Sequence, residues 1–498
     1  MAFKAGAGDT PVLTEVPGLT GAGDSFGSSA PDAREGKMKS HLQAGFEQVR
    51  NRLKGDRQPG GREIFVRIAR NALHLGAGNG TSVVIGMITL GLMARYLGPR
   101  ALGILAMIEA YGTLCDQILR LETWQSIVKY GATALEQKDG RRFALLVKFG
   151  AAIDLVCAAI TGTVALLAIP LVARLMGWDQ QTVEMAQFYM IAVYFAVSST
   201  PMGVLRLFDR FAQFAWLDPA IAAARLVGTL LIIETGGTIW AFLAMSIGLQ
   251  ILQRLSLTFM AWRTLDQNGF GRFWQAPLRG TPAQFPGFWS FTLSANAAVL
   301  LRKATQELDI LVVGSLAGSY QAGIYQIVRK LTLAINRAGG MLQQVAFPDL
   351  ARLWTRRDLG QFSRVVRNVE AMTMAFAAVA MLALVIMGHH LISALAGPAF
   401  AEAYVPLLVQ SLASMLFLAG STLRPALMCM DCQLQLLRIM VFATVLFCLV
   451  LFSSVATFGL IGAACAHIAF AATVLVAATA MFRRRLRAER GSSPSLQG

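Results

Sequence analysis

Long, nearly uncharged apolar blocks recur along the whole chain and constrain its fold more than any other feature. Many are close to the length of about 20 residues that a helix needs to cross a bilayer. Only 14% of the 498 residues are charged, against about 25% in soluble domains. Lipid offers the backbone no hydrogen-bonding partners, so each block is expected to be a helix. The sequence lacks the two-residue alternation of apolar and polar side chains that is typical of a membrane β-barrel. The chain is therefore predicted to be an all-α integral membrane protein.

The apolar pattern predicts about twelve spanning helices. We expect them at 72–95, 104–127, 144–172, 184–206, 216–235, 238–262, 287–315, 320–346, 370–396, 403–428, 435–455 and 458–482.

Lysine and arginine collect in alternate loops and in the C-terminal tail, which sets the expected orientation. Arg100 and Arg174 are exceptions in the opposite loops. By the positive-inside rule both termini are expected in the cytoplasm. The net charge of +16 is therefore attributed to the orientation of the chain in the membrane and not to a surface that binds nucleic acid. The residues that carry this pattern are Lys129, Lys138, Arg141, Arg142, Arg206, Arg210, Arg263, Arg272, Arg279, Arg352, Arg356, Arg357, Arg364, Arg367, Arg483, Arg484, Arg485, Arg487 and Arg490.

Composition divides the chain into five parts. Residues 1–70 are expected to be a cytoplasmic, basic and mostly disordered extension, in which 40–56 is either an amphipathic helix on the membrane surface or a solvated linker. Residues 71–265 and 285–482 are predicted to be two six-helix bundles. The stretch 266–284 is a predicted cytoplasmic linker, and 483–498 is a predicted basic cytoplasmic tail.

The two predicted bundles resemble each other weakly at an offset of roughly 220 residues. Six helices per half keep the orientation, so the repeat is expected to be parallel, as in transporters that rock two bundles about a central site. The matches are Gly98 and Gly103-Ile104 with Gly318 and Gly323-Ile324; Ser199-Thr200, Leu205 and Asp209 with Ser421-Thr422, Leu427 and Asp431; and Gly237, Ile239, Ala241 and Ala244 with Gly459, Ile461, Ala463 and Ala466.

Charged residues interrupt several predicted spans, where a charge near the bilayer centre costs about 2.5 kcal/mol or more. Such groups are expected to line a polar cavity between the halves, although pairs that only hold helices together, or snorkelling, would also explain single residues. The cations would bind an anionic group such as a phosphate or pyrophosphate. These predicted substrate-binding residues are Arg302, Lys303, Arg329, Lys330, Arg337, Arg120 and Arg95; the predicted ion-coupling or gating residues are Asp116, Glu109, Glu307 and Asp309.

Histidines and cysteines show no metal-binding pattern. His74, His389, His390 and His467 stand alone or as a doublet and are interpreted as structural. Cys429 and Cys432 form a C-x-x-C pair with no second pair, so a zinc or redox role is not expected. No metal and no cofactor are predicted.

Several short stretches resemble bacterial polysaccharide flippases, which move lipid-linked oligosaccharides for O-antigen, capsule or exopolysaccharide. The resemblance covers roughly residues 65–485. It is carried by Met93–Gly103 (MARYLGPRALG), Leu308–Gly314 (LDILVVG), Ala322–Tyr325 (AGIY), Phe347-Pro348 and Gly459–Ala464 (GLIGAA).

The resemblance implies the fold of the multidrug, oligosaccharidyl-lipid and polysaccharide exporter superfamily: two six-helix bundles and alternating access. It implies translocation of a polyprenyl-pyrophosphate-linked oligosaccharide across the bacterial cytoplasmic (inner) membrane, driven by a proton or sodium gradient. The basic cavity would hold the pyrophosphate and sugar. Other polysaccharide assembly proteins are implied partners; nucleic acid is not.

Three other functions compete with the flippase interpretation. A cation-coupled multidrug antiporter of the same superfamily would favour an acidic cavity for organic cations. A membrane glycosyltransferase or polymerase would need catalytic groups in sizeable outer loops, and these loops are short. A passive scaffold would leave the intramembrane charges without a role. A non-enzymatic flippase is the expectation that fits best.

Overall fold

The computed structural model describes residues 61–210, 215–275 and 284–492. These residues form helices and turns, without a strand among them, and belong to one compact unit. The predicted helix 40–56 lies outside the described residues. The helices are α2 (Gly61–Leu119), α3 (Trp124–Glu136), α4 (Gly140–Met176), α5 (Gln180–Tyr194), α6 (Ser199–Leu207), α8 (Leu217–Glu234), α9 (Ile239–Gln267), η1 (Phe273–Gln275), α11 (Phe288–Thr355), α12 (Leu359–Ala396), η2 (Pro398–Ala403), α13 (Tyr404–Ala419), α14 (Leu423–Cys429), α15 (Gln433–Phe458) and α16 (Leu460–Ser492).

Each predicted span falls on these helices. The long α2 and α11 hold two spans each, α5 with α6 forms one, and α13 with α14 forms another. By length and hydropathy alone, eight described stretches qualify as membrane spans. The criterion counts α2 once and includes neither α8 nor α11. It also allows two charged residues in an 18-residue window, and α8 carries Asp218, Arg225 and Glu234. The all-α membrane fold is thus confirmed.

Sharp bends at two equivalent glycines divide α2 and α11. Gly98 has φ 72° and ψ 174°, and Gly318 has φ 87° and ψ 170°. This left-handed backbone is open to glycine at little cost. Pro99 follows the first bend directly, where its missing N–H costs no helical hydrogen bond. Each bend therefore turns one span into the next without an intervening loop.

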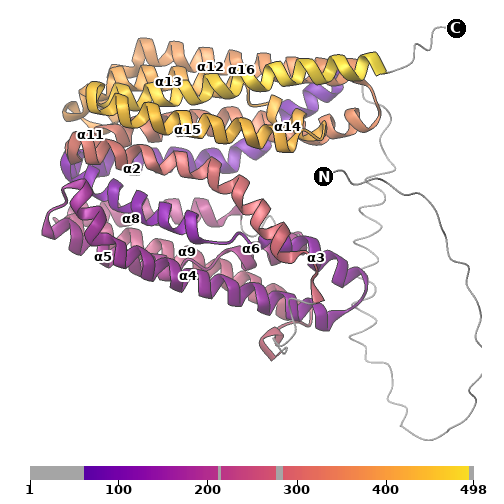
Figure 1. Ribbon diagram of the computed structural model, residues 1–498. Helices are drawn as coiled ribbons and strands as arrows, with labels where there is room; N and C mark the ends of the chain where they lie inside the picture. Colours follow the sequence, from indigo (N-terminus) through magenta and orange to yellow (C-terminus); the bar gives the residue numbers. More distant parts are fainter. Residues whose placement is uncertain (1–60, 211–214, 276–283, 493–498) are drawn as a thin grey trace, which may run out of the picture. The chain divides into compact units, whose positions relative to one another are not determined.

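The helices form two groups, with α2 and α11 shared between them (Figure 1). α12, α13, α15 and α16 lie together, whereas α4, α5, α8 and α9 lie in the other group. The pair α2 and α11 makes the most extensive contact in the described chain. This arrangement agrees with the two predicted bundles and places their contact on the two bent helices.

The internal repeat is confirmed by turns of matching conformation. Lys138 (φ 56°) precedes α4, and Arg357 (φ 59°) precedes α12. Each is followed by an aspartate that caps the next helix: Asp139 and Asp358 each accept a hydrogen bond of 2.9 Å from the backbone N–H three residues on. Capping of this kind satisfies a free N–H at the helix start.

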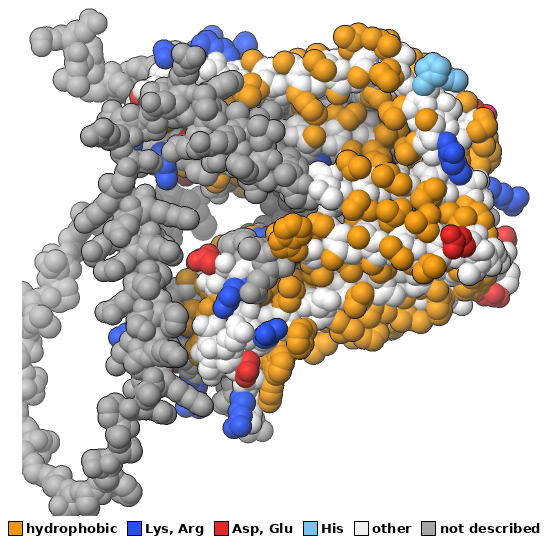
Figure 2. All heavy atoms as spheres, turned by 180° about the vertical axis from the view of Figure 1, so that it is seen from behind, with side chains coloured by type: hydrophobic (Ala, Val, Ile, Leu, Met, Phe, Trp, Pro, Cys, Tyr) orange, Lys and Arg blue, Asp and Glu red, His pale blue; other side chains and the backbone are white. Residues whose placement is uncertain are grey.

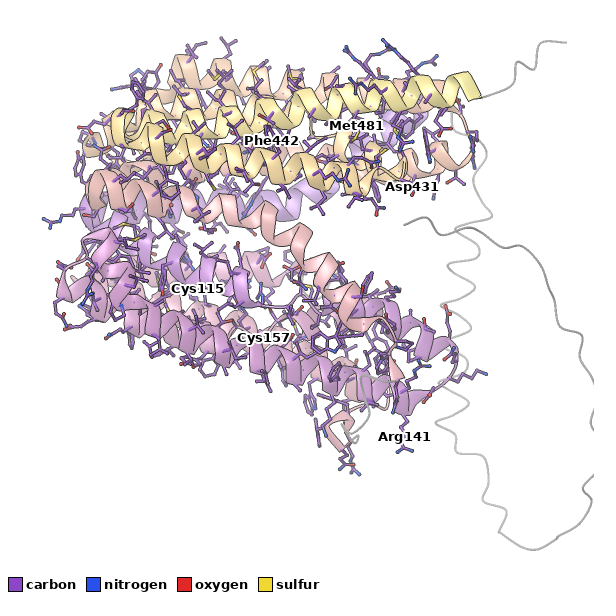
Figure 3. The ribbon with its side chains drawn as sticks, in the orientation of Figure 1. Cys115, Arg141, Cys157, Asp431, Phe442 and Met481 are labelled. Atoms are coloured by element: carbon purple, nitrogen blue, oxygen red, sulfur yellow. The ribbon has the colours of Figure 1, made fainter. Side chains whose placement is uncertain are left out.

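A second pair of turns follows the two short helices α6 and α14. Asp209 (φ 54°) and Asp431 (φ 56°) are left-handed in these turns, and Asp431 is marked at the end of its helix in Figure 3. Aspartate tolerates this conformation better than most residues. Both aspartates belong to the repeat seen in the sequence, so the match extends from sequence to backbone.

Two glycines allow the halves to touch. A Cβ on Gly103 would overlap the carbonyl oxygen of Ser319, and a Cβ on Gly323 would overlap the carbonyl oxygen of Pro99. Small residues permit such close backbone approach between membrane helices. The contact is reciprocal and lies beside the two bends, so it ties the halves at that end.

Apolar side chains cover much of the outer surface. Leu167 is 74% exposed and Val379 is 67% exposed, and Figure 2 shows hydrophobic side chains over most of one face, with charged ones toward its ends. A surface like this suits contact with lipid. α16 continues to Ser492, so the predicted tail 483–498 begins as helix, and of the predicted linker 266–284 the structure describes 266–275 and residue 284.

Candidate functional site

A cavity of about 780 Å³ lies among α2, α8, α9 and α11. Its walls come from both halves of the repeat, because α11 belongs to the second half. Met87, Leu90, Met93 and Leu105 make part of it apolar, while polar and charged side chains line the rest. Its size is within the range of about 300–1,000 Å³ that small-molecule sites occupy.

Cations of α11 project into this cavity. Lys330 and Arg337 both line it, as predicted from their spacing of seven residues, which places them on one helix face. Within the described part of the chain neither forms an ion pair. Their ammonium and guanidinium groups are therefore available to an anion in the cavity.

Another part of the cavity lining carries an ion pair between α8 and α2. Arg225 Nη1 lies 3.9 Å from Oε1 of Glu109, and both residues line the cavity. Glu109 was predicted as a coupling residue. Arg225 was left out of the predicted site, although its position seven residues after Asp218 puts the two on one face of α8, and Asp218 also lines the cavity.

Amide side chains of α9 complete this wall. Gln253 Nε2 donates a hydrogen bond of 2.9 Å to Oδ1 of Asp218. Gln250 Nε2 donates one of 2.5 Å to the hydroxyl of Tyr189, a residue of α5 that is 2% exposed. Sequence reasoning concentrated on charges and missed both glutamines.

Asp116 and Arg120 join a cluster within the first half and do not line the cavity. Asp116 Oδ2 lies 3.2 Å from Arg120 Nη1 and 3.6 Å from Arg254 Nη2. Both arginines also donate to Oγ of Ser198, at 3.0 and 2.7 Å. The cluster links α2 to α9 and to the turn before α6. These contacts are those of a helix-linking network, the structural alternative that the sequence left open.

Asp309 is the centre of a buried cluster in the second half. It is 2% exposed, accepts a hydrogen bond of 3.0 Å from the Tyr325 hydroxyl, and lies 3.0 Å from Nε2 of His467. Arg329 bridges two carboxylates, with Nη2 at 2.5 Å from Glu307 and Nε at 3.7 Å from Asp309. Arg329 is thus engaged by carboxylates and does not line the cavity.

His467 has a carboxylate partner that the sequence did not indicate. The sequence interpretation of this histidine was structural, and α16 places it against Asp309 of α11, with the ring of Phe447 beside it at 4.9 Å between centroids. No spacing along the chain could indicate this pair, because the two residues are 158 positions apart.

Arg95 lies outside the cavity, at the end where the halves touch. It donates to the carbonyl oxygens of Ser393, Ala394 and Leu395 in the last turn of α12. A cation there complements the negative end of the helix dipole. The geometry places Arg95 as a tie between the halves. Arg302 and Lys303 lie on α11, but their side chains are outside the described part of the chain.

Comparison with known proteins identifies relatives. Residues 68–354 match the family described as "Polysaccharide biosynthesis protein". The inner membrane protein YghQ of Escherichia coli (strain K12) is 28% identical over 353 residues, which cover 68% of this chain and 95% of that protein.

Solved structures share the fold at low identity. The lipid II flippase MurJ in an inward closed conformation is 14% identical with a TM-score of 0.65, over 84% of this chain and 91% of that one. An inward-facing MATE family multidrug resistance transporter of the MOP superfamily is 15% identical with a TM-score of 0.60, over 85% and 96%. A MOP superfamily transporter from Pyrococcus furiosus, described as having a binding pocket of reversed polarity, is 12% identical with a TM-score of 0.55, over 87% and 97%.

Proposed function

Because the chain belongs to the polysaccharide biosynthesis protein family, we propose that it moves a polyprenyl-pyrophosphate-linked oligosaccharide across the cytoplasmic membrane by alternating access. The observation that carries the proposal is the cavity between the halves, with Lys330 and Arg337 free on its α11 wall, within the described chain. The MOP-superfamily fold supports a transporter with this architecture.

The charges of the cavity favour an anionic substrate. Lys330 and Arg337 are two cations on one wall, whereas Glu109 is paired with Arg225 and Asp218 accepts a hydrogen bond from Gln253. A pyrophosphate offers several acceptor oxygens to such donors. An organic cation would meet the two free cations, so a multidrug antiporter is the weaker alternative. Under this proposal the polyprenyl chain stays in the bilayer.

The contacts that join the halves at one end correspond to one conformational state of the proposed transport cycle. The halves meet at Gly103 and Gly323, and Arg95 bonds α12 at the same end. If both termini are cytoplasmic, as the distribution of Lys and Arg suggests, this end faces outward and the cavity is reached from the cytoplasm. Transport would require these contacts to open.

We assign the coupling ion to the Asp309 and His467 pair. Glu109 and Asp116 each face arginines, and Glu307 is held by Arg329. Asp309 shares that arginine but has a histidine as its close partner, and histidine is the side chain that changes charge most readily near neutral pH. A proton bound there would change the charge that holds α16 to α11. We further propose that enzymes of polysaccharide assembly supply and consume the transported lipid.

Deletion of the gene tests the proposal. The account predicts less surface polysaccharide, together with lipid-linked oligosaccharide that accumulates on the cytoplasmic face of the membrane. Rescue by the intact gene, but not by a Lys330→Ala, Arg337→Ala double variant of equal abundance, would tie the defect to the cavity. Unchanged surface glycan with increased sensitivity to cationic toxins would contradict the proposal and favour the multidrug antiporter.

A further inference from the structure

One face of α8 turns toward the cavity. Asp218, Ile221, Ala222 and Arg225 line it at the i, i+3, i+4 and i+7 spacing of a single helix face. The face combines a carboxylate and a guanidinium with two small or apolar positions between them. A ligand on this wall would therefore meet polar groups at both ends of an apolar floor.

The polar groups of this wall are held in place before any ligand binds. Asp218 is bonded to Gln253, and Gln250 is bonded to the largely buried Tyr189. Each carboxamide retains donor or acceptor capacity beyond these single bonds, and the second oxygen of Asp218 can accept more. Fixed planar groups with mixed donor and acceptor character are suited to sugar hydroxyls, each of which both donates and accepts.

We propose that the cavity has two subsites, and that Asp218, Gln250 and Gln253 recognise the first sugars of the substrate while Lys330 and Arg337 hold its pyrophosphate. The inference rests on the proposed function and adds the residues that select the glycan. The α8 and α9 wall belongs to the first half, and the cationic wall belongs to α11 of the second. The substrate is thus held by both halves at once.

Binding of two probes to the purified protein separates the subsites. One probe is a polyprenyl pyrophosphate without sugar, and the other is the same lipid with a saccharide chain from the source cells. We expect Gln253→Ala and Asp218→Asn to weaken binding of the glycosylated lipid roughly five- to tenfold, the loss of about one hydrogen bond, while binding of the bare lipid changes less than about twofold. Lys330→Ala should weaken both.

Gln180→Ala is the matched control, because Gln180 is an exposed amide at the start of α5 and does not line the cavity. A second variant, Gln253→Met, keeps the length of the side chain without its amide or any added charge if Gln253→Ala does not fold. Equal loss of both probes in the Gln253 and Asp218 variants, or no loss in either, would overturn the sugar subsite and leave the proposed function standing. If the unaltered protein bound neither probe, both proposals would fail.

Discussion

Charged side chains within the membrane differ in what surrounds them, and these surroundings separate the residues proposed to bind substrate from those that pair with other side chains. Lys330 and Arg337 face open volume, whereas Arg120, Arg254 and Arg329 face carboxylates. A buried charge is costly unless it is paired. Cations that face the cavity keep their capacity for an external anion, and so they are the residues on which transport should depend.

Replacement of Lys330 or Arg337 by alanine should lower transport with little effect on folding. Loss of one charged hydrogen-bonding partner costs about 1.5–3 kcal/mol, so we expect a roughly tenfold or greater fall in the initial rate of lipid transport for each variant. Arg174→Ala is the control, since Arg174 is exposed near the end of α4. Rates equal to the control in both variants would remove these cations from the site.

The buried pair Asp309 and His467 should be needed for coupling. With His467→Gln we expect gradient-driven transport to fall at least about tenfold while exchange without a gradient persists, because the ring that can gain a proton is gone. His389→Gln is the control, because His389 is exposed. Asp309→Asn removes the carboxylate beside His467 while Arg329 keeps Glu307, and it should also lower stability, by about 1–3 kcal/mol. Unaltered coupling in both Asp309 and His467 variants would exclude the pair.

Asp179 provides a pH-dependent test outside the membrane. Its carboxylate accepts hydrogen bonds from the side chain and backbone of Thr182, and these bonds, with the charge of Arg100, hold the pKa of Asp179 below its ordinary value. The stabilisation is therefore present above the unfolded pKa of about 3.9 and is lost as the pH falls through the folded pKa.

We expect Asp179→Ala to lower the stability of the protein by about 0.5–2 kcal/mol near neutral pH, the usual cost of a lost N-cap. Thermal unfolding in detergent at several pH values would measure the difference. It should shrink as the pH is lowered below about 4, and a difference that grew on acidification would contradict the capping account.

At the scale of helices, α2 and α11 combine several tasks in two continuous elements. Each crosses the membrane twice around a glycine bend, and together they supply the contact between the halves and much of the cavity lining. The pattern of apolar blocks in the sequence predicts each span, and Gly98 and Gly318 stand out in the sequence. The absence of a loop at each bend could not be predicted, because it depends on left-handed backbone at one residue.

Gly103→Val should separate the halves at the bends. Its side chain would overlap backbone atoms of Ser319 and Gly323, and overpacking of this kind costs about 1–3 kcal/mol. We expect a distance reporter, such as spin labels placed on either side of the contact, to shift toward longer separations. Gly248→Val is the control, since a Cβ there meets no atom within 4 Å and the residue does not line the cavity. Unchanged distances in Gly103→Val would show that this contact does not hold the closed end.

At the scale of the whole molecule, two copies of one pattern have acquired different chemistry. The matched turns at Asp209 and Asp431 keep the same left-handed backbone, so the repeat was visible in sequence and holds in structure. The contents of the two halves differ: an arginine network surrounds Asp116 in the first, and a histidine contacts Asp309 in the second.

The sequence alone predicts the span positions, the repeat and the cations Lys330 and Arg337, since these depend on hydropathy and local spacing. It does not predict partners across helices. His467 with Asp309, Gln253 with Asp218, and Arg95 with α12 join residues that are distant along the chain. These contacts arise only from packing, and the proposed division into substrate-binding and helix-linking charges rests on them.

Transport by the purified protein in vesicles tests the central claim most directly. Vesicles would contain labelled polyprenyl-pyrophosphate-linked oligosaccharide from the source cells, and a glycan-modifying enzyme added outside would report which leaflet the glycan faces. The account predicts that the protein makes the protected pool accessible much faster than in protein-free vesicles, and that Lys330→Ala slows this exchange roughly tenfold. Exchange no faster than in protein-free vesicles, from correctly folded protein supplied with an ion gradient, would contradict it.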